Sequence, residues 1–218
     1  MQIAILGTGM VGKTLAAKLA SLGHVVTMGT RDPDATRERD GMAAWLAENR
    51  GVTLLSFATA AAGAEQVWNA TGGKISLEVL HQCGAENLAG KVLVDIANPL
   101  DFSAGFPPTL SVCNHDSLGE QVQRAFPAAR VVKTLNTVNA TLMVEPQTLA
   151  GGAHTMFVCG DDEGAKAAVT AVLQSFGWSD VLDLGGIGQA RGMEMLLPLW
   201  VRLYGKFGSP AFSFAVVR

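Results

Sequence analysis

Short apolar runs alternate along the chain with longer segments whose apolar residues recur at helical spacing. In residues 10–22, for example, Val11, Leu15 and Leu19 recur every four positions. The runs predicted as strands are residues 2–6, 25–28, 52–55, 66–70, 92–96, 130–135, 156–158 and 181–184. Strands that alternate with helices of this length predict an α/β protein, with a parallel sheet and helices on both faces.

Two segments are predicted as long helices, residues 34–50 and residues 187–206, the second with a kink at Pro198. The second helix is apolar nearly all round, so it must be buried on several sides, and one domain of this size offers limited cover. This predicts a subunit interface, and we expect a homodimer. Arg191 and Glu194 stand three residues apart on the same helix and are expected to pair with each other.

A glycine-rich motif follows the first predicted strand and opens the first predicted helix. It is the pattern GxGxxG, at Gly7-Thr8-Gly9-Met10-Val11-Gly12. In this context Gly7 allows the tight turn, Gly9 lets a pyrophosphate approach, and Gly12 lets the helix pack closely on the sheet. The helix N-terminus then offers free N–H groups to the phosphates. These residues predict a Rossmann-type dinucleotide site.

The second strand indicates which dinucleotide binds. A site for NAD places a carboxylate at this strand's end, where it holds the ribose 2′-hydroxyl. Here the strand ends in Thr30 and Arg31, and no carboxylate follows until Asp32. A hydroxyl and a planar guanidinium suit a phosphate, which favours NADP(H). Arg37 and Arg39 follow within reach of the same phosphate, but we expect them to be solvated surface charges.

The 218 residues allow one domain, or one domain with a small appendage. The Gly151-Gly152 pair is the best candidate for a boundary. We therefore predict a doubly wound Rossmann domain that binds NADP over residues 1–150. A small C-terminal α/β part, residues 151–218, is expected to contribute to the substrate pocket and to the dimer interface.

Three predicted strands end in polar or turn residues. These are Thr71 after one strand, Asn98-Pro99 after another and Asn136-Thr137 after a third. Because ligands bind outside the carboxyl ends of parallel strands, these residues are expected to surround the nicotinamide and the hydride acceptor, with Thr71 and Asn98 also touching the cofactor. The alternative, that the asparagines are only turn and cap residues, stays equally open.

Charge and residue spacing exclude several classes of function. The formal net charge is −3, from 16 Lys and Arg against 19 Asp and Glu. No basic excess exists to bind a phosphate backbone, so we expect no nucleic-acid partner. The histidines and cysteines lack metal-ligand spacing, so no metal site is predicted. The single tyrosine, Tyr204, has Gly208 four residues on, which excludes the Tyr-x-x-x-Lys pattern of short-chain dehydrogenases.

No segment predicts export or insertion into a membrane. The N-terminus begins with a strand and has no basic region or cleavage site. The most apolar later stretch, residues 193–204, carries Glu194, Pro198 and Arg202 and is too short to span a bilayer. We therefore expect a cytoplasmic protein with reduced thiols and no membrane partner.

These motifs together resemble the NADP oxidoreductase family that acts on the deazaflavin coenzyme F-420, and also the cytosolic NADPH domain of the STEAP metalloreductases. The resemblance covers nearly the whole chain. It is carried by the glycine loop, Gly29-Thr30-Arg31, residues 131–137, residues 158–162, and residues 182–185 followed by Ala190, Arg191 and Glu194.

The resemblance implies an NADP-dependent oxidoreductase, in which Thr30 and Arg31 hold the 2′-phosphate. It also implies that a flavin-like acceptor, either F-420 or a flavin, stacks on the nicotinamide near Asn98-Pro99 and Asn136-Thr137. Two departures bear on the acceptor. Asp32 stands where the deazaflavin enzymes carry a second basic residue. Residues 133–136 read Lys-Thr-Leu-Asn where those enzymes have a His-Thr-Ile-Pro type of segment. The version in this chain is closer to the metalloreductase domain, which uses a flavin.

Two other functions remain open at this point. A non-catalytic NADP(H) sensor would keep the glycine loop and Arg31 but lose the acceptor pocket. A reductase of a small imine or ketone would need a proton donor, and the sequence offers no evident one. The absence of an acid–base constellation favours hydride transfer between two ring systems, in which the protein mainly orients the reactants.

Overall fold

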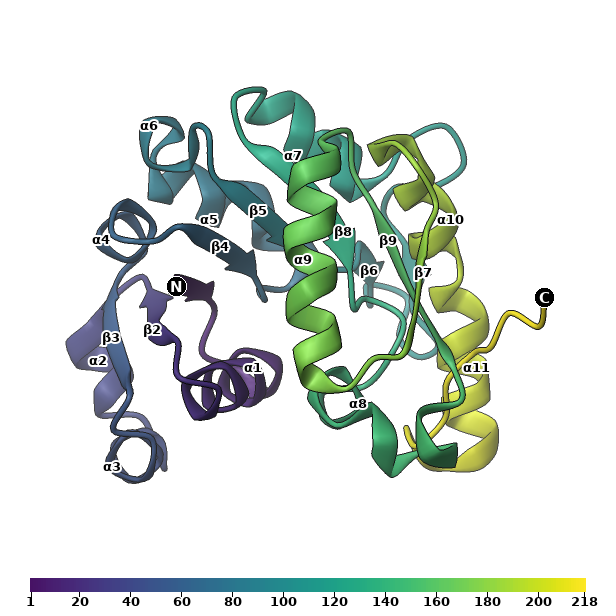
Figure 1. Cartoon of the computed structure of the whole chain (residues 1–218), viewed down its shortest axis with the longest axis horizontal. Coiled ribbons are helices and arrows are strands. Elements are labelled where there is room, and N and C mark those ends of the chain that lie inside the picture. Colours follow the sequence, from purple (N-terminus) through teal and green to yellow (C-terminus); the bar gives the residue numbers. More distant parts are fainter.

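A computed structural model describes all residues, 1–218, and shows a mostly parallel eight-stranded sheet with helices on both faces (Figure 1). The strand order is β10-β9-β8-β5-β4-β1-β2-β3. The strands are β1 Gln2–Leu6, β2 Val25–Thr30, β3 Val52–Ser56, β4 Gln66–Asn69, β5 Val92–Asp95, β8 Arg130–Thr134, β9 Thr155–Cys159 and β10 Asp180–Asp183. A separate two-stranded hairpin pairs β6 Leu100–Asp101 with β7 Thr109–Leu110.

The strand order confirms the predicted Rossmann-type fold. The chain builds outward from β1 through β2 to β3, then returns to β4 on the other side of β1 and continues through β5 to β8. All of these neighbours pair in parallel. The direction of winding reverses between β1 and β4, and in open sheets of this kind the ligand crevice lies at that switch point.

The last two strands differ from the all-parallel sheet that the sequence predicts. β9 pairs antiparallel with β8, in the register Lys133↔Cys159, and β10 pairs parallel with β9. The segment between residues 135 and 154 stays at the carboxyl end of β8, so β9 starts there and runs back. β9 and β10 continue the same sheet as the strands before residue 150. The division of the chain at residue 150 stays a prediction.

Eleven helices surround the sheet. They are α1 Met10–Ser21, α2 Pro33–Arg37, α3 Met42–Glu48, α4 Phe57–Ala62, α5 Ser76–Cys83, α6 Ala85–Leu88, α7 Leu118–Ala125, α8 Ala140–Val144, α9 Glu163–Phe176, α10 Ala190–Met195 and α11 Leu197–Phe207. None of them is both long enough and apolar enough to cross a membrane.

Both long helices expected from the sequence are interrupted. The helix predicted over residues 34–50 is two helices, α2 and α3, because Gly41 between them adopts the left-handed conformation with φ 72°. The helix predicted over residues 187–206 is a 3-10 turn followed by α10 and α11. The break falls at Leu196, close to the kink predicted at Pro198, whose missing N–H removes a helical hydrogen bond.

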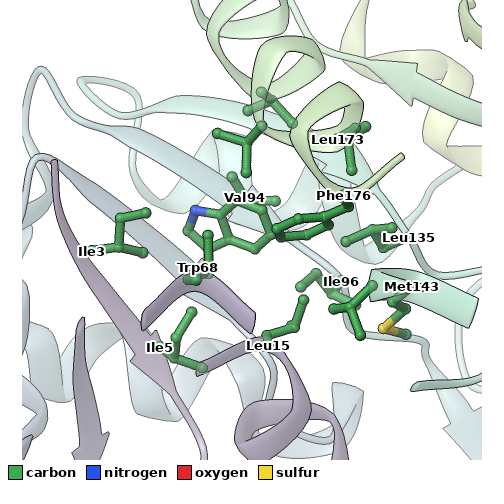
Figure 2. Packing of buried hydrophobic residues seen from close by; sticks show 14 of the residues in the cluster. Ile3, Ile5, Leu15, Trp68, Val94, Ile96, Leu135, Met143, Leu173 and Phe176 are labelled. Carbon is green, nitrogen blue, oxygen red and sulfur yellow. The ribbon is translucent and has the colours of Figure 1, made fainter. Parts of the chain in front are cut away.

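The core consists of two hydrophobic clusters, one on each face of the sheet. Alternation along β1 shows the division, because Ile3 and Ile5 join a cluster of 27 buried residues while Ala4 and Leu6 join one of 22. The first cluster packs against α1, α8 and α9, and the second against α4, α5, α7 and α10. Figure 2 shows the first cluster, where the ring of Trp68 lies 6.2 Å from that of Phe176. The sheet is therefore buried on both faces.

Candidate functional site

The glycine loop adopts the strand–turn–helix arrangement predicted for it. Gly7 has a φ of 107°, and a Cβ there would lie 2.8 Å from the carbonyl oxygen of Ala70. A Cβ on Gly12 would collide with the carbonyl of Gly7, at the place where α1 packs on the loop. A Cβ on Gly9, in contrast, would meet no atom within 4 Å. Gly7 and Gly12 are therefore required by the fold itself, whereas Gly9 faces open space at the N-terminus of α1.

A cavity of about 330 Å³ opens between this loop and the end of β2. Its lining residues are Gly7, Thr8, Gly9, Gly29, Thr30, Arg31, Arg39, Phe57, Ala70, Thr71, Gly72, Ile75 and Val79. Pairing between β1 and β2 brings the two halves together, because Leu6 lies opposite Gly29 and the Gly7 N–H donates to the Gly29 carbonyl at 3.1 Å.

The two residues predicted to select NADP differ in exposure. Thr30 is buried, and its hydroxyl lies 2.8 Å from the hydroxyl of Thr36 on α2. Arg31 extends into solvent, where its guanidinium pairs with the Glu78 carboxylate at 3.2 Å. Thr30 therefore anchors α2 against the end of β2, while Arg31 offers the accessible positive charge.

Arg37 and Arg39, both expected to be surface charges, occupy different positions. Arg37 pairs with Asp34 at 3.4 Å and does not line the cavity. Arg39 lines the cavity, with its Nη1 3.5 Å from the Thr8 hydroxyl. No pattern in the sequence distinguishes the two arginines, because only the turn between α2 and α3 directs Arg39 toward the glycine loop.

A larger cavity, of about 690 Å³, lies beyond the carboxyl ends of β4, β5 and β8. Its lining residues, 12 of 21 of them hydrophobic, are Met10, Val11, Ala70, Thr71, Gly72, Gly73, Lys74, Ile96, Ala97, Asn98, Leu100, Asp101, Phe102, Ser103, Asn136, Val138, Asn139, Ala140, Met143, Leu197 and Trp200. The two cavities share Ala70, Thr71 and Gly72, so they form one crevice across the switch point.

Most of the predicted acceptor residues meet at this cavity. Thr71, Asn98 and Asn136 line it, and Pro99 and Thr137 are buried next to the asparagines without reaching the wall. The Asn136 amide nitrogen donates to the Asn98 side-chain oxygen at 3.0 Å, and the Asn98 amide nitrogen donates to the Asn136 carbonyl at 2.9 Å. The two asparagines thus tie together the loops that follow β5 and β8.

A buried ion cluster, which the sequence did not reveal, lies beneath the cavity wall. Lys133 on β8 is fully buried, with its ammonium 2.8 Å from the carboxylates of both Asp95 and Glu194. The ammonium also donates to the carbonyl of Ala97, which lines the cavity. Burial alone lowers the pKa of Lys133, but the two carboxylates outweigh it and hold that pKa above its usual value. One visible signal is that Lys133 directly follows two valines inside a predicted strand.

The expected pairing of Arg191 with Glu194 is wrong. The Arg191 guanidinium instead binds the Glu120 carboxylate through two contacts, of 2.6 Å and 2.8 Å. The Glu194 carboxylate accepts the main-chain N–H groups of Leu118 and Gly119 at 2.8 Å and 3.0 Å, at the N-terminus of α7. Because α10 packs on that end of α7, partners from another element displace the neighbour one helical turn away.

The larger cavity contains little acid–base chemistry. Its ionisable lining residues are Lys74 and Asp101, and it has no histidine, tyrosine or cysteine. Hydrogen bonds from the N–H and hydroxyl of Ser103 lower the pKa of Asp101, which therefore stays ionised near neutral pH and is a poor proton donor. The cavity is suited to orienting a flat apolar ligand rather than to delivering a proton.

Comparison with known proteins agrees with this geometry. The family model described as NADP oxidoreductase, coenzyme F420-dependent, matches residues 2–99. The F420-dependent NADP reductase of Methanocaldococcus jannaschii is 28% identical over 215 residues, covering 96% of this chain and 95% of that protein. Metalloreductase STEAP3 of Rattus norvegicus is 30% identical over 210 residues, but the chain spans only 38% of that protein's length.

Among solved structures, a protein of Arthrobacter sp. FB24, provisionally named an F420-dependent NADP reductase, is 60% identical with a TM-score of 0.98, and the match covers 100% of both chains. An imine reductase of Aspergillus terreus has a TM-score of 0.66 at 17% identity, which is a likeness of fold alone. With a relative of 60% identity along its whole length, the chain belongs to the coenzyme F420-dependent NADP oxidoreductase family.

Proposed function

We propose that this protein transfers a hydride between NADPH and a deazaflavin of the F420 type. The observation that carries the proposal is the large, mostly apolar cavity, which joins a phosphate-binding type of loop and has only Lys74 and Asp101 as ionisable lining residues. When bound, NADPH supplies a hydride from nicotinamide C4, and the acceptor takes it at ring carbon 5 together with a proton from solvent.

The smaller cavity would hold the adenosine end of the dinucleotide. The open space over Gly9 leaves room for a pyrophosphate at the N-terminus of α1, whose free N–H groups and dipole favour anions. Arg31 would bind the 2′-phosphate, because its guanidinium is exposed at the end of β2 and no carboxylate holds the ribose there. Binding a phosphate at Arg31 competes with the contact to Glu78, which costs little because both partners are exposed.

The larger cavity would hold the nicotinamide and the acceptor ring. Thr71, Asn98 and Asn136 line it and offer amides and a hydroxyl, which can orient two rings without exchanging protons. Hydride transfer requires the rings to stack at roughly 3–3.5 Å with the reacting carbons aligned. The contacts between Asn98 and Asn136 support such alignment because they fix the two loops relative to each other.

Two expectations from the sequence complete the proposal. The exposed apolar side chains of α11, among them Leu199 at 49% and Phe207 at 58%, support the proposed homodimer. A small C-terminal part contributing to the substrate pocket is supported by Leu197 and Trp200, which line the larger cavity. A cytoplasmic location also stays a proposal.

A deazaflavin is preferred over a flavin because the relatives that match this chain along almost their whole length are named for F420. The sensor hypothesis expects a lost acceptor pocket, which the cavity of about 690 Å³ does not support.

Purified protein is to be mixed anaerobically with NADPH and, separately, F420, FMN, FAD or a cyclic imine. Of these acceptors, we expect only F420 to cause rapid consumption of NADPH. Consumption with only a flavin or only the imine would contradict the proposal.

A further inference from the structure

Three arginines stand near the end of β2, and their partners differ. Arg31 contacts the Glu78 carboxylate at 3.2 Å, and Arg37 contacts the Asp34 carboxylate at 3.4 Å. Arg39 has no carboxylate within ion-pairing distance, and its single side-chain contact is the long one to the Thr8 hydroxyl at 3.5 Å. Of the two arginines that line the smaller cavity, only Arg39 therefore has a guanidinium that no acid neutralises.

The backbone fixes Arg39 in this position. The buried hydroxyl pair of Thr30 and Thr36 holds α2 against the end of β2, and the Arg39 N–H donates to the Thr36 carbonyl at 3.2 Å. On the other side, the Met42 N–H donates to the Arg39 carbonyl at 3.0 Å. Arg39 thus sits in a hydrogen-bonded turn between α2 and α3, with its guanidinium next to Thr8 of the glycine loop.

Two arginines therefore line one small cavity. Arg31 approaches from the end of β2, and Arg39 approaches over Thr8 of the glycine loop. A ribose hydroxyl offers little to a guanidinium group, whereas two arginines together can bind several oxygens of one phosphate. Asp32 does not pair with either arginine, since its carboxylate caps α2 by accepting the Ala35 N–H at 3.0 Å.

We propose that Arg39 is a second specificity-determining residue, which binds the 2′-phosphate of NADP(H) together with Arg31. This rests on the proposed use of NADPH and adds the residue that completes its phosphate site. Arg39 has no ion pair to lose on binding a phosphate, only the long contact to the Thr8 hydroxyl. Arg39 therefore contributes to affinity for the phosphate without the competing contact that Arg31 makes with Glu78.

The test measures binding of two small ligands by calorimetry, without any hydride acceptor. Adenosine 2′,5′-bisphosphate and adenosine 5′-monophosphate differ only in the 2′-phosphate. For Arg39→Gln we expect an affinity for the bisphosphate lower by about tenfold or more, the range for a hydrogen bond to a charged group. The affinity for the monophosphate should not change, and Arg39→Lys should retain part of the preference.

Arg37→Gln is the matched control, because Arg37 is an exposed arginine two residues away that does not line the cavity. It should bind both ligands as the wild type does. An Arg39→Gln variant that binds the bisphosphate normally, or that loses affinity for both ligands equally, would overturn the assignment of Arg39. A wild type that does not distinguish the two ligands would overturn the proposed preference for NADP as well, so the two failures are separable.

Discussion

The ammonium of Lys133 and the carboxylate of Glu194 form a fully buried ion pair, with Nζ and Oε1 2.8 Å apart. Lys133 belongs to the interior strand β8, and Glu194 belongs to α10, which packs over the start of α7. Asp95 adds a second carboxylate from β5, also at 2.8 Å. One cation thus connects two strands and a helix directly beneath the wall of the larger cavity.

Removing that cation should destabilise the protein strongly. In Lys133→Met the carboxylates of Asp95 and Glu194 would remain buried without a counter-charge. Breaking a buried ion pair on one side typically costs about 3–5 kcal/mol, and we expect a loss of that size in the free energy of unfolding, measured with urea. The control is Arg124→Met, which removes a partially exposed pair with Asp116 and should cost only about 0–1 kcal/mol. Equal losses in both variants would contradict this account.

Two glycines of the same loop should respond oppositely to substitution. Gly9→Val should leave the melting temperature nearly unchanged, because a Cβ there meets no atom within 4 Å and the backbone is extended. It should abolish NADPH binding, since the branched side chain occupies the proposed place of the pyrophosphate. Gly12→Ala should instead lower the melting temperature, because its Cβ collides with the Gly7 carbonyl. A Gly9→Val protein with normal NADPH affinity would place the cofactor elsewhere.

Asn136 is expected to act on the acceptor rather than on the cofactor. Asn136→Ala removes the hydrogen bonds from its amide to Asn98 and to the Met193 carbonyl, which loosens the wall of the larger cavity. Losing hydrogen bonds of about 0.5–1.5 kcal/mol each should lower kcat/KM for the acceptor by roughly tenfold. The dissociation constant for NADPH should stay within about twofold of the wild-type value. Asn87→Ala, which removes a similar contact to the Cys83 carbonyl, serves as control; the reverse pattern would assign Asn136 to the dinucleotide.

Assembly is tested by charging the exposed face of α11. Leu199 is 49% exposed, so Leu199→Glu should fold normally and convert the proposed dimer into a monomer in light scattering. Leu22→Glu alters a leucine of similar exposure, at 41%, beyond the end of α1, and should remain dimeric. A wild-type protein that is monomeric at micromolar concentration would refute the proposed interface.

The cysteines should differ in reactivity. Burial raises the pKa of the Cys83 and Cys159 thiols to about 12, so almost no thiolate exists at either near neutral pH. Cys113 is exposed. A thiol reagent should therefore modify one cysteine per folded chain and three per unfolded chain. Fast modification of more than one cysteine in the folded protein would contradict the packing around β9 and α5.

The parts of this fold that depend on local spacing could be predicted from the sequence. Helical and strand periodicities predicted the order of elements, and GxGxxG predicted the loop, because the motif lies between a strand and a helix that are adjacent in the sequence. Strand ends gave Asn98 and Asn136, since parallel strands present their carboxyl ends at one edge. The direction of β9 was missed because apolar periodicity is the same for parallel and antiparallel strands.

The long-range partners could not be predicted. Lys133 and Asp95 lie 38 residues apart, and neither position shows which acid will meet the lysine in the folded core. Arg191 and Glu194 have the spacing of a local ion pair, yet each contacts a residue of α7 instead. Arg39 differs from Arg37 only through the turn made by Gly41, which separates the two helices and sets the direction of the side chain.

Direct hydride transfer is the central claim, and isotope transfer tests it most directly. NADPH carrying deuterium at both positions of nicotinamide C4 is incubated with the wild-type protein and oxidised F420, and the reduced deazaflavin is analysed by mass spectrometry. Carbon-bound hydrogen at ring position 5 does not exchange with water, so the label is retained. Transfer of one deuterium per reduced F420 is the predicted result. Reduced F420 without deuterium, or no reduction of F420 at all, would contradict the account.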